Sequence, residues 1–209
     1  MTDIKDKSLQ IYLDELASKA PTPGGGSAAA LMGAQAAALV GMVCNLTIGK
    51  PKYAEVEAEM GVLLDRSKAL RERLAGMIKA DVDVFDRLMA CYGMPKETEA
   101  QKAVRSEAIQ ALLKEATEVP LECARACFEV IELSRIAAEK GNIGVISDAG
   151  VAVMSAYAGL KSAALNVYIN VGSLKDKEFA ERKTLELESI LEGTEQAVDD
   201  VYRIVKERL

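Results

Sequence analysis

Apolar residues recur every three or four positions along most of this chain, the spacing of one face of an α-helix. Glycine or proline ends several of these runs, as Gly93 and Pro95 do after residue 92. Strand signals are scarce, so we predict a single all-α domain over residues 1–209, a bundle of long antiparallel helices. The expected helices span residues 9–17, 26–48, 53–92, 97–118, 120–140, 146–171 and 176–209, with Pro120 beginning or kinking the fifth.

Two of these predicted helices are mainly apolar and carry strips of small residues four positions apart. The first strip is Ala29, Gly33, Ala37 and Gly41, and the second is Ser155, Gly159 and Ala163. Small residues at this spacing let two helices approach closely, so we expect these two to pack on each other. Small-residue seams in so apolar a chain also favour a homodimer.

The uncharged stretch from Gly24 to Gly49 is long enough to cross a bilayer. It consists mostly of Ala and Gly and carries four polar residues, which lowers its affinity for lipid. These residues are Ser27, Gln35, Asn45 and Thr47. We therefore expect a central helix of the bundle and no membrane partner.

Composition narrows the possible partners and the compartment. The formal charge of −6 argues against a nucleic-acid-binding surface. Charged residues at positions 3, 5, 6 and 7 stand where an export signal would be apolar, so we expect a cytoplasmic protein. The cysteines are then expected to be buried reduced thiols, although zinc or iron–sulfur ligation is the alternative. They are Cys44, Cys91, Cys123 and Cys127.

Histidine is absent from all 209 residues. Catalytic triads and dyads that use an imidazole are therefore excluded, as are His-rich zinc sites. Any acid–base chemistry must use a carboxylate, Lys, Tyr or Cys with a shifted pKa.

The segment "IKADVDVFDRLM", residues 78–89, carries the strongest candidate for that chemistry. Asp81 lies one helical turn before Phe85, near the predicted inner face, where partial desolvation would raise its pKa. Asp83 and Asp86 are expected at the surface. Asp81 is the candidate general acid–base.

The stretch "APTPGGGSAAAL", residues 20–31, places three glycines at the start of a helix. It matches neither common glycine-rich phosphate motif. Gly24, Gly25, Gly26 and Ser27 form either a permissive hinge or a bare backbone against which a ligand lies, with free N–H groups at the helix start.

Two further segments carry candidate binding residues. Lys50 and Lys52 follow the end of the central helix, where they either complement the helix dipole or hold an acidic substrate. Around the next turn, the candidate helix caps or ligand contacts are Asn142, Ser147 and Asp148. Asn166 and Asn170 share one face of an apolar helix, so their amides need partners, either each other or a ligand.

In this order the segments resemble one known family. "APTPGGGSAAAL", "NLTIGKPKY", the D-x-x-x-F of Asp81 and Phe85, "YGMPK" and "KGNIGVISDAGVAVMSAYAGLKSAALNVYIN" resemble the cyclodeaminase-like domain of the formiminotransferase-cyclodeaminase family, nearest to its stand-alone bacterial methenyltetrahydrofolate cyclohydrolases. The resemblance covers nearly the whole chain. It implies an all-helical, homodimeric, cytosolic enzyme that acts on folate one-carbon adducts without metal or redox cofactor. It also implies the catalytic role of Asp81.

We therefore expect hydrolysis of 5,10-methenyltetrahydrofolate to 10-formyltetrahydrofolate. The alternatives are a formimidoyltetrahydrofolate cyclodeaminase that releases ammonia and a non-enzymatic helical dimer or folate-binding module. The chain has room only for the cyclodeaminase-like domain, which favours the cyclohydrolase. We expect the glycines to let the pterin approach the backbone, and Lys50 with Lys52 to meet the glutamate tail. The acceptors for the pterin are expected among Asp148, Asn142 and Asn166.

Overall fold

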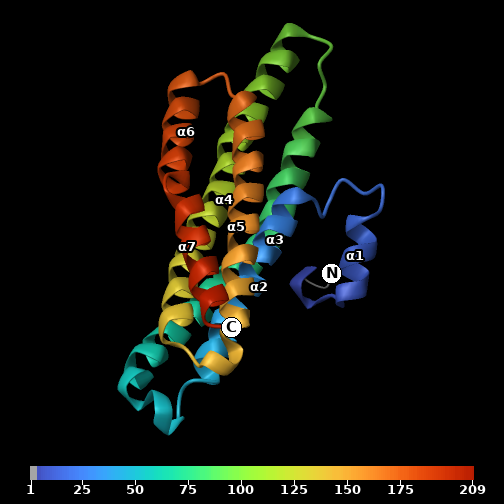
Figure 1. Cartoon of the computed structure of the whole chain (residues 1–209). Helices are drawn as coiled ribbons and strands as arrows, with labels where there is room; N and C mark the ends of the chain where they lie inside the picture. The colour runs from blue at the N-terminus through green and yellow to red at the C-terminus, as the bar shows by residue number, and fades with distance from the viewer. Residues whose placement is uncertain (1–3) are drawn as a thin grey trace.

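A computed structural model describes residues 4–209 of the chain, and no strand occurs in that range. The long helices are α2 (Gly25–Asn45), α3 (Glu57–Tyr92), α4 (Glu99–Lys140) and α5 (Ile146–Gly172). The shorter ones are α1 (Leu9–Leu16), α6 (Lys177–Leu191) and α7 (Thr194–Glu207), and 3-10 turns occupy η1 (Ile4–Asp6), η2 (Pro51–Val56) and η3 (Ile143–Val145). Consecutive long helices run antiparallel along an elongated bundle, with α1 on one flank (Figure 1). The predicted all-α bundle is confirmed.

Helix α2 lies in the core because its small residues admit close neighbours. A Cβ atom on Gly159 of α5 would lie 3.0 Å from the Ala29 carbonyl oxygen and 3.2 Å from the Gly33 nitrogen. The Ser155 hydroxyl donates to the Met32 carbonyl at 2.9 Å. The predicted packing of the two apolar helices is confirmed.

Two helices are long and apolar enough to span a membrane by length and composition alone. They are Gly25–Asn45 and Ile143–Gly172. The most apolar window of the first is 61% buried within the protein, and that of the second is 44% buried. The first is the core helix α2. The second contains α5, which packs on α2 along one face and exposes the other.

Pro120 lies inside α4, which runs from Glu99 to Lys140, so the alternative that a new helix begins there is wrong. Proline lacks the N–H that would bond the carbonyl four residues earlier, so the Ala116 carbonyl loses its helical partner. The Asn170 side-chain amide on α5 donates to that carbonyl at 2.6 Å. The partner of Asn170 is therefore the carbonyl that the proline leaves without a helical donor, and this hydrogen bond helps α4 to continue through residue 120.

The single helix predicted over residues 176–209 is also wrong, because it is two helices. Gly193 has φ = 71°, a left-handed conformation, and separates α6 from α7. An L side chain at this position would be strained, whereas glycine adopts it readily.

The four cysteines are unpaired thiols. Cys44, Cys123 and Cys127 are buried and Cys91 is half-buried. A hydrogen bond with Cys123 and burial hold the pKa of Cys127 well above its usual value. Such thiols behave as core residues.

Candidate active site

Asp81 meets the N-terminal turn of α2 from the facing side of α3. The Ser27 hydroxyl donates to Asp81 Oδ2 at 2.9 Å and lies 3.3 Å from the Ile78 carbonyl oxygen. The Ser27 backbone N–H also donates to the carboxylate. Ser27 is in the first turn of α2, where N–H groups have no helical partner, so the carboxylate occupies the anion-binding end of that helix.

Gly26 leaves the space that the carboxylate fills. A Cβ atom there would lie 2.1 Å from Asp81 Oδ1 and 2.6 Å from its Cγ, far inside van der Waals contact. Any side chain at position 26 would therefore displace the carboxylate. Within the run "GGGS", Gly26 is therefore the position that lets the helical backbone lie directly against the carboxylate.

Two effects act in opposite directions on the pKa of Asp81. Burial raises it, and the hydrogen bonds from the Ser27 hydroxyl and backbone lower it by a smaller amount, so the pKa lies above its usual value of 3.8. A carboxyl group of this kind holds and releases a proton closer to neutral pH than an exposed one does. The expected partial desolvation of Asp81 is observed.

Asn166 and Phe85 lie close to this pair. A Cβ atom on Gly25 would be 3.7 Å from the Asn166 amide nitrogen, which brings α5 to the site. That amide donates to the Ser162 carbonyl at 2.9 Å. Phe85 follows Asp81 by one turn of α3 and is half-buried. Gly24, at the N-cap of α2, completes the glycine bend beside them.

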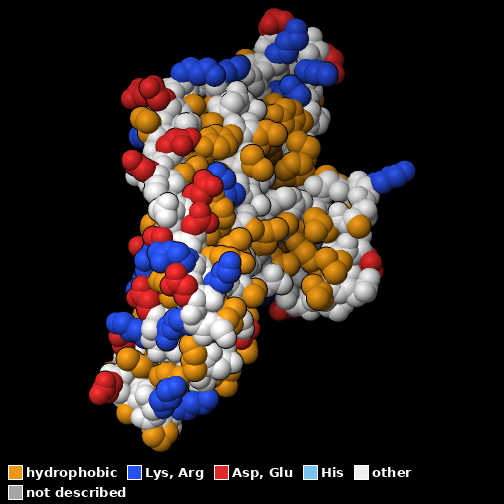
Figure 2. Space-filling view, in the orientation of Figure 1, with side chains coloured by type: hydrophobic (Ala, Val, Ile, Leu, Met, Phe, Trp, Pro, Cys, Tyr) orange, Lys and Arg blue, Asp and Glu red, His pale blue; other side chains and the backbone are white. Residues whose placement is uncertain are grey.

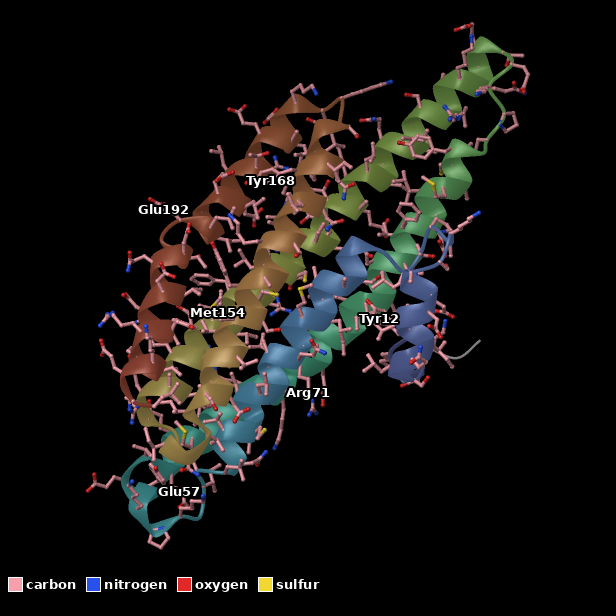
Figure 3. All side chains as sticks on the ribbon, turned by 45° about the vertical axis from the view of Figure 1, so that its right-hand side comes forward. Tyr12, Glu57, Arg71, Met154, Tyr168 and Glu192 are labelled. Carbon is pink, nitrogen blue, oxygen red and sulfur yellow. The ribbon has the colours of Figure 1, made fainter. Side chains whose placement is uncertain are left out.

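Tyr12 is a neighbour of Asp81 that the sequence analysis did not single out. It is the buried residue of α1 and lies between that helix and the bundle (Figure 3). Burial raises the pKa of Tyr12, and the negative charge of Asp81 raises it further, so the phenol keeps its proton. The sequence signal was an aromatic residue in a short amphipathic helix, which by itself indicates only a core contact.

The other predicted binding residues gather at the opposite end of α2, around Asn142. The Asn142 amide donates to the Leu46 carbonyl at 2.8 Å, and its backbone N–H donates to the Thr47 hydroxyl at 2.9 Å. Its side-chain oxygen accepts from the Gly144 N–H at 3.0 Å and from the Tyr53 hydroxyl at 3.3 Å. Asn142 therefore ties the turn before α5 to the end of α2.

Lys50, Ser147 and Asp148 belong to this second group. Lys50 is exposed at the N-cap of η2, and Lys52 lies 5.6 Å from the centre of the Tyr53 ring. Ser147 is exposed and Asp148 half-buried in the first turn of α5. The N-cap of that helix is Val145, so the alternative that Ser147 or Asp148 caps it is wrong.

The two groups are separated by the length of α2. Ser27 and Asn45 are about 27 Å apart at 1.5 Å per residue. Glu57, whose carboxylate accepts from the Gly49 N–H, marks the second end in Figure 3, well away from Tyr12. One copy of the chain therefore brings Gly24, Gly25, Gly26, Ser27, Phe85 and Asn166 to Asp81, and does not bring Lys50, Asn142, Ser147 or Asp148 there.

A metal ion needs several ligating side chains close together. No group of three or more His, Cys, Asp or Glu side chains within residues 4–209 is arranged to hold one. The polar groups beside Asp81 are a hydroxyl, a phenol, an amide and backbone N–H groups, which suit hydrogen bonding to an organic ligand.

With this geometry in place, comparison with known proteins supplies the family. The sequence model of the formiminotransferase-cyclodeaminase family matches residues 8–189. The chain belongs to this family. The match includes the glycine bend, Asp81, the Asn142 turn and Asn166, so the resemblance carried by those segments is confirmed.

Relatives within the family bear two activities in their names. A Methylorubrum extorquens protein named methenyltetrahydrofolate cyclohydrolase is 56% identical over 204 residues, 98% of each chain. The rat formimidoyltransferase-cyclodeaminase is 30% identical over 187 residues, which cover 90% of this chain and 35% of the rat protein. The crystal structure of formiminotetrahydrofolate cyclodeaminase from Thermotoga maritima matches with a TM-score of 0.83 at 31% identity, covering 99% of this chain and 97% of that one.

Proposed function

We propose that the protein hydrolyses 5,10-methenyltetrahydrofolate to 10-formyltetrahydrofolate, with Asp81 as general acid and base. The observation that carries this proposal is the Asp81 carboxylate, which Ser27 holds against the bare backbone of Gly26 with a raised pKa. The substrate is taken from the name of the relative that is 56% identical over nearly the whole chain.

The chemistry needs one group that moves protons at the methenyl carbon, which bridges N5 and N10 as a cation. Ionised Asp81 accepts a proton from water while the water oxygen bonds to that carbon, giving a neutral tetrahedral adduct. Protonated Asp81 then donates to N5 as the carbon–N5 bond breaks. The hydroxyl proton of the adduct leaves to Asp81 and then to solvent as the formyl C=O forms, so the reaction releases one proton overall. The negative charge of Asp81 also favours the cationic substrate.

Residues around Asp81 would bind the pterin. Its flat ring needs close backbone approach, which Gly24 and Gly25 permit, and a partner for its polar edge, for which the Asn166 amide is placed beside Gly25. The half-buried Phe85 ring offers an apolar contact. The reaction is redox-neutral, so we propose that it needs no redox cofactor. We also propose that it needs no metal and takes place in the cytoplasm. Dialysis against a chelator should then leave its rate unchanged.

Cyclodeamination is the second candidate. It is favoured by the Thermotoga maritima structure, which superposes on this fold with a TM-score of 0.83. In that reaction N10 attacks the formimino carbon, and ammonia leaves through a similar tetrahedral adduct that the same aspartate would serve.

Two parallel assays distinguish the candidates. Purified protein is given methenyltetrahydrofolate, with loss of its near-ultraviolet absorbance followed, and separately 5-formiminotetrahydrofolate, with ammonia measured. We expect turnover of the first substrate. Ammonia release without methenyl hydrolysis would replace the cyclohydrolase with the cyclodeaminase, and activity with neither would leave a folate-binding module.

The role of Asp81 is tested by Asp81→Asn. The amide keeps the shape of the side chain but cannot accept the proton, so we expect turnover to fall by at least about a hundredfold while the circular dichroism spectrum is retained. Wild-type rates from the folded variant would remove Asp81 from the mechanism.

We also propose a homodimer, formed through the outer face of α5 and the adjoining end of α2. This face has a row of exposed apolar side chains, which we call the α5 stripe: Val151, Met154, Leu165 and Ile169, with Met42 and Leu46 on α2. In Figure 2, charged side chains crowd over α6 and α7, while apolar ones gather over the neighbouring α5 and over α1. An apolar face of this kind on a soluble domain is typical of an interface.

An antiparallel pair would also unite the two groups of predicted binding residues. In a two-fold dimer packed along α2 and α5, the end of α2 that holds Asp81 in one copy faces the opposite end in the other. Lys50 and Asp148 of the second copy would then lie near Asp81 of the first, in reach of the substrate tail and ring. The expected roles of Asn142, Ser147 and Asp148 as ring contacts are proposed in this arrangement.

Complementation tests this arrangement. Asp81→Asn and Lys50→Glu chains are mixed, unfolded and refolded together, and kcat/KM is compared with that of each variant alone. Because half of the random dimers are mixed and each has one intact shared site, about a quarter of wild-type activity should return. Mixed dimers that form, as shown by a tag pull-down, yet stay inactive would contradict the arrangement in which Lys50 of one copy serves Asp81 of the other.

A further inference from the structure

Tyr12 has a buried hydroxyl group with no hydrogen-bond partner. Its side chain is 6% exposed, and its hydroxyl oxygen is the one buried side-chain polar atom within residues 4–209 that lacks a partner. Burying a hydroxyl without a hydrogen bond destabilises the folded arrangement that buries it. A phenylalanine would fill the same space without this cost, so the hydroxyl has another use.

Most of the helix that carries Tyr12 faces solvent. Leu9, Ile11 and Leu13 of α1 are 63%, 49% and 48% exposed, and Tyr12 is the buried residue of this helix. An ion pair of 2.7 Å links Lys7, which directly follows η1, to Glu15 of α1, so we treat η1 and α1 as one unit. Docking of this unit therefore depends on the buried Tyr12, together with the half-buried Ile4 and Leu16 that pack against the same core.

A cavity of about 220 Å³ lies between this unit and the bundle. Tyr12 and Ile4 line one side of it, and Leu31 of α2 with Ala75 and Ile78 of α3 line the other. Atoms that face a cavity lose van der Waals contacts, so this interface is held more weakly than the close-packed core. Segments with few buried contacts open at low free-energy cost.

The cavity adjoins the reacting carboxylate. Ile78 lines it, and the carbonyl oxygen of Ile78 lies 3.3 Å from the Ser27 hydroxyl that donates to Asp81. The negative charge of Asp81 acts on the Tyr12 phenol and, with burial, keeps its pKa raised. Tyr12 is therefore a neutral hydrogen-bond donor at the edge of the site.

We propose that α1 is a lid over the Asp81 site and that Tyr12 is its latch, whose hydroxyl donates a hydrogen bond to an acceptor on the reduced pterin when the lid closes. This inference rests on the proposed function. Without substrate, the unpaired hydroxyl weakens the docking of α1 and lets the site open. With substrate bound, the hydroxyl gains its partner, so binding and closure reinforce each other.

Tyr12→Phe separates this role from a packing role. Because it removes only the hydroxyl, we expect KM for methenyltetrahydrofolate to rise about tenfold, the factor expected for one hydrogen bond. The melting temperature should stay the same or rise, because a buried unpaired group is gone. The matched control is Leu13→Ala on the exposed side of the same helix, which should leave both kinetic constants unchanged.

Hydrogen exchange of wild-type protein supplies the second measurement. With 5-formyltetrahydrofolate as a stable ligand, amide exchange in residues 9–16 should slow, while exchange in α4 stays the same. An unchanged KM in Tyr12→Phe, or unchanged exchange in α1 with the site saturated, would overturn the lid. Failure of wild-type protein to hydrolyse methenyltetrahydrofolate would instead refute the proposed function, so the two failures are distinguishable.

Discussion

At the scale of single residues, the site depends on an acid and on the absence of a side chain opposite it. Burial of Asp81 raises its pKa, while its carboxylate still accepts a hydrogen bond from the Ser27 hydroxyl. Gly26 provides the space in which both conditions are met. This close approach explains the glycine at position 26, which would otherwise lower the stability of the helix.

Gly26→Ala should therefore disable the enzyme without unfolding it. The new methyl group overlaps the carboxylate, which must move by about 1 Å or more, and such a displacement reduces kcat by about a hundredfold. The control is Gly76→Ala on α3, where a Cβ atom would meet nothing within 4 Å. That variant should keep full activity and gain up to about 1 kcal/mol in unfolding free energy. Near-normal kcat in Gly26→Ala would mean that the position of the carboxylate matters little.

The raised pKa of Asp81 also predicts a pH dependence of stability. The folded state holds this proton to higher pH than the unfolded state, whose value is near 3.8, so ionisation costs stability as pH rises through the folded pKa. Asp81→Asn removes that loss. Urea unfolding at a series of pH values above 3.8 should show that the unfolding free energy of the variant rises relative to that of the wild type as pH increases. Parallel stability curves would contradict the raised pKa.

At the scale of helices, one interhelical bond compensates for a proline. The Ala116 carbonyl in α4 lacks a helical donor because residue 120 is proline, and Asn170 of α5 supplies one at 2.6 Å. This contact both completes α4 and joins it to α5, the helix that brings Asn166 to the active site.

Asn170→Ala should destabilise the protein by about 1–3 kcal/mol, because it leaves that carbonyl buried and unpaired. In a Pro120→Ala background, residue 120 regains an N–H for the same carbonyl, so the second substitution should cost clearly less. Urea unfolding of the four proteins in this double-mutant cycle measures the difference. Equal costs in both backgrounds would show that Asn170 acts elsewhere.

At the scale of the whole molecule, no element within residues 4–209 of a single copy covers the α5 stripe. Leu165 and Ile169 are 69% and 70% exposed, although α5 is a core helix on its other face. A second copy would bury this surface and would supply the binding residues that a single chain places at the far end of α2, where Asn45 lies about 27 Å from Ser27 by the helical rise.

Leu165→Glu should convert the proposed dimer to a monomer, since a charge at the centre of an apolar interface weakens association by about a hundredfold or more. Size-exclusion chromatography with light scattering measures the change. Leu185→Glu on α6, also highly exposed but outside the stripe, is the control and should keep the wild-type mass. A monomeric wild type, or a dimer that tolerates Leu165→Glu, would refute this interface.

Much of the fold was predictable from local pattern. The apolar spacing and the Gly and Pro stops predicted most of the helices, because each signal acts within a few residues of the boundary that it sets. The errors at Pro120 and Gly193 have physical causes. The helix does not end at Pro120, because a donor from another helix pairs with the carbonyl that the proline leaves free. The helix does end at Gly193, because this glycine adopts a left-handed conformation that a helical pattern does not reveal.

The sequence by itself determined the helical class and narrowed the candidates for acid–base chemistry: because no histidine is available, a partly buried aspartate was left as the candidate proton carrier. Only the tertiary structure decided which groups meet. In the fold, Gly26 lies against Asp81, and Tyr12 lies near enough for the charge of Asp81 to raise its pKa. Asn142 lies at the far end of α2. The physical reason is range, since helix formation depends on neighbours a few positions apart, whereas a site depends on packing between segments that lie 50 or more positions apart, as Ser27 and Asp81 do.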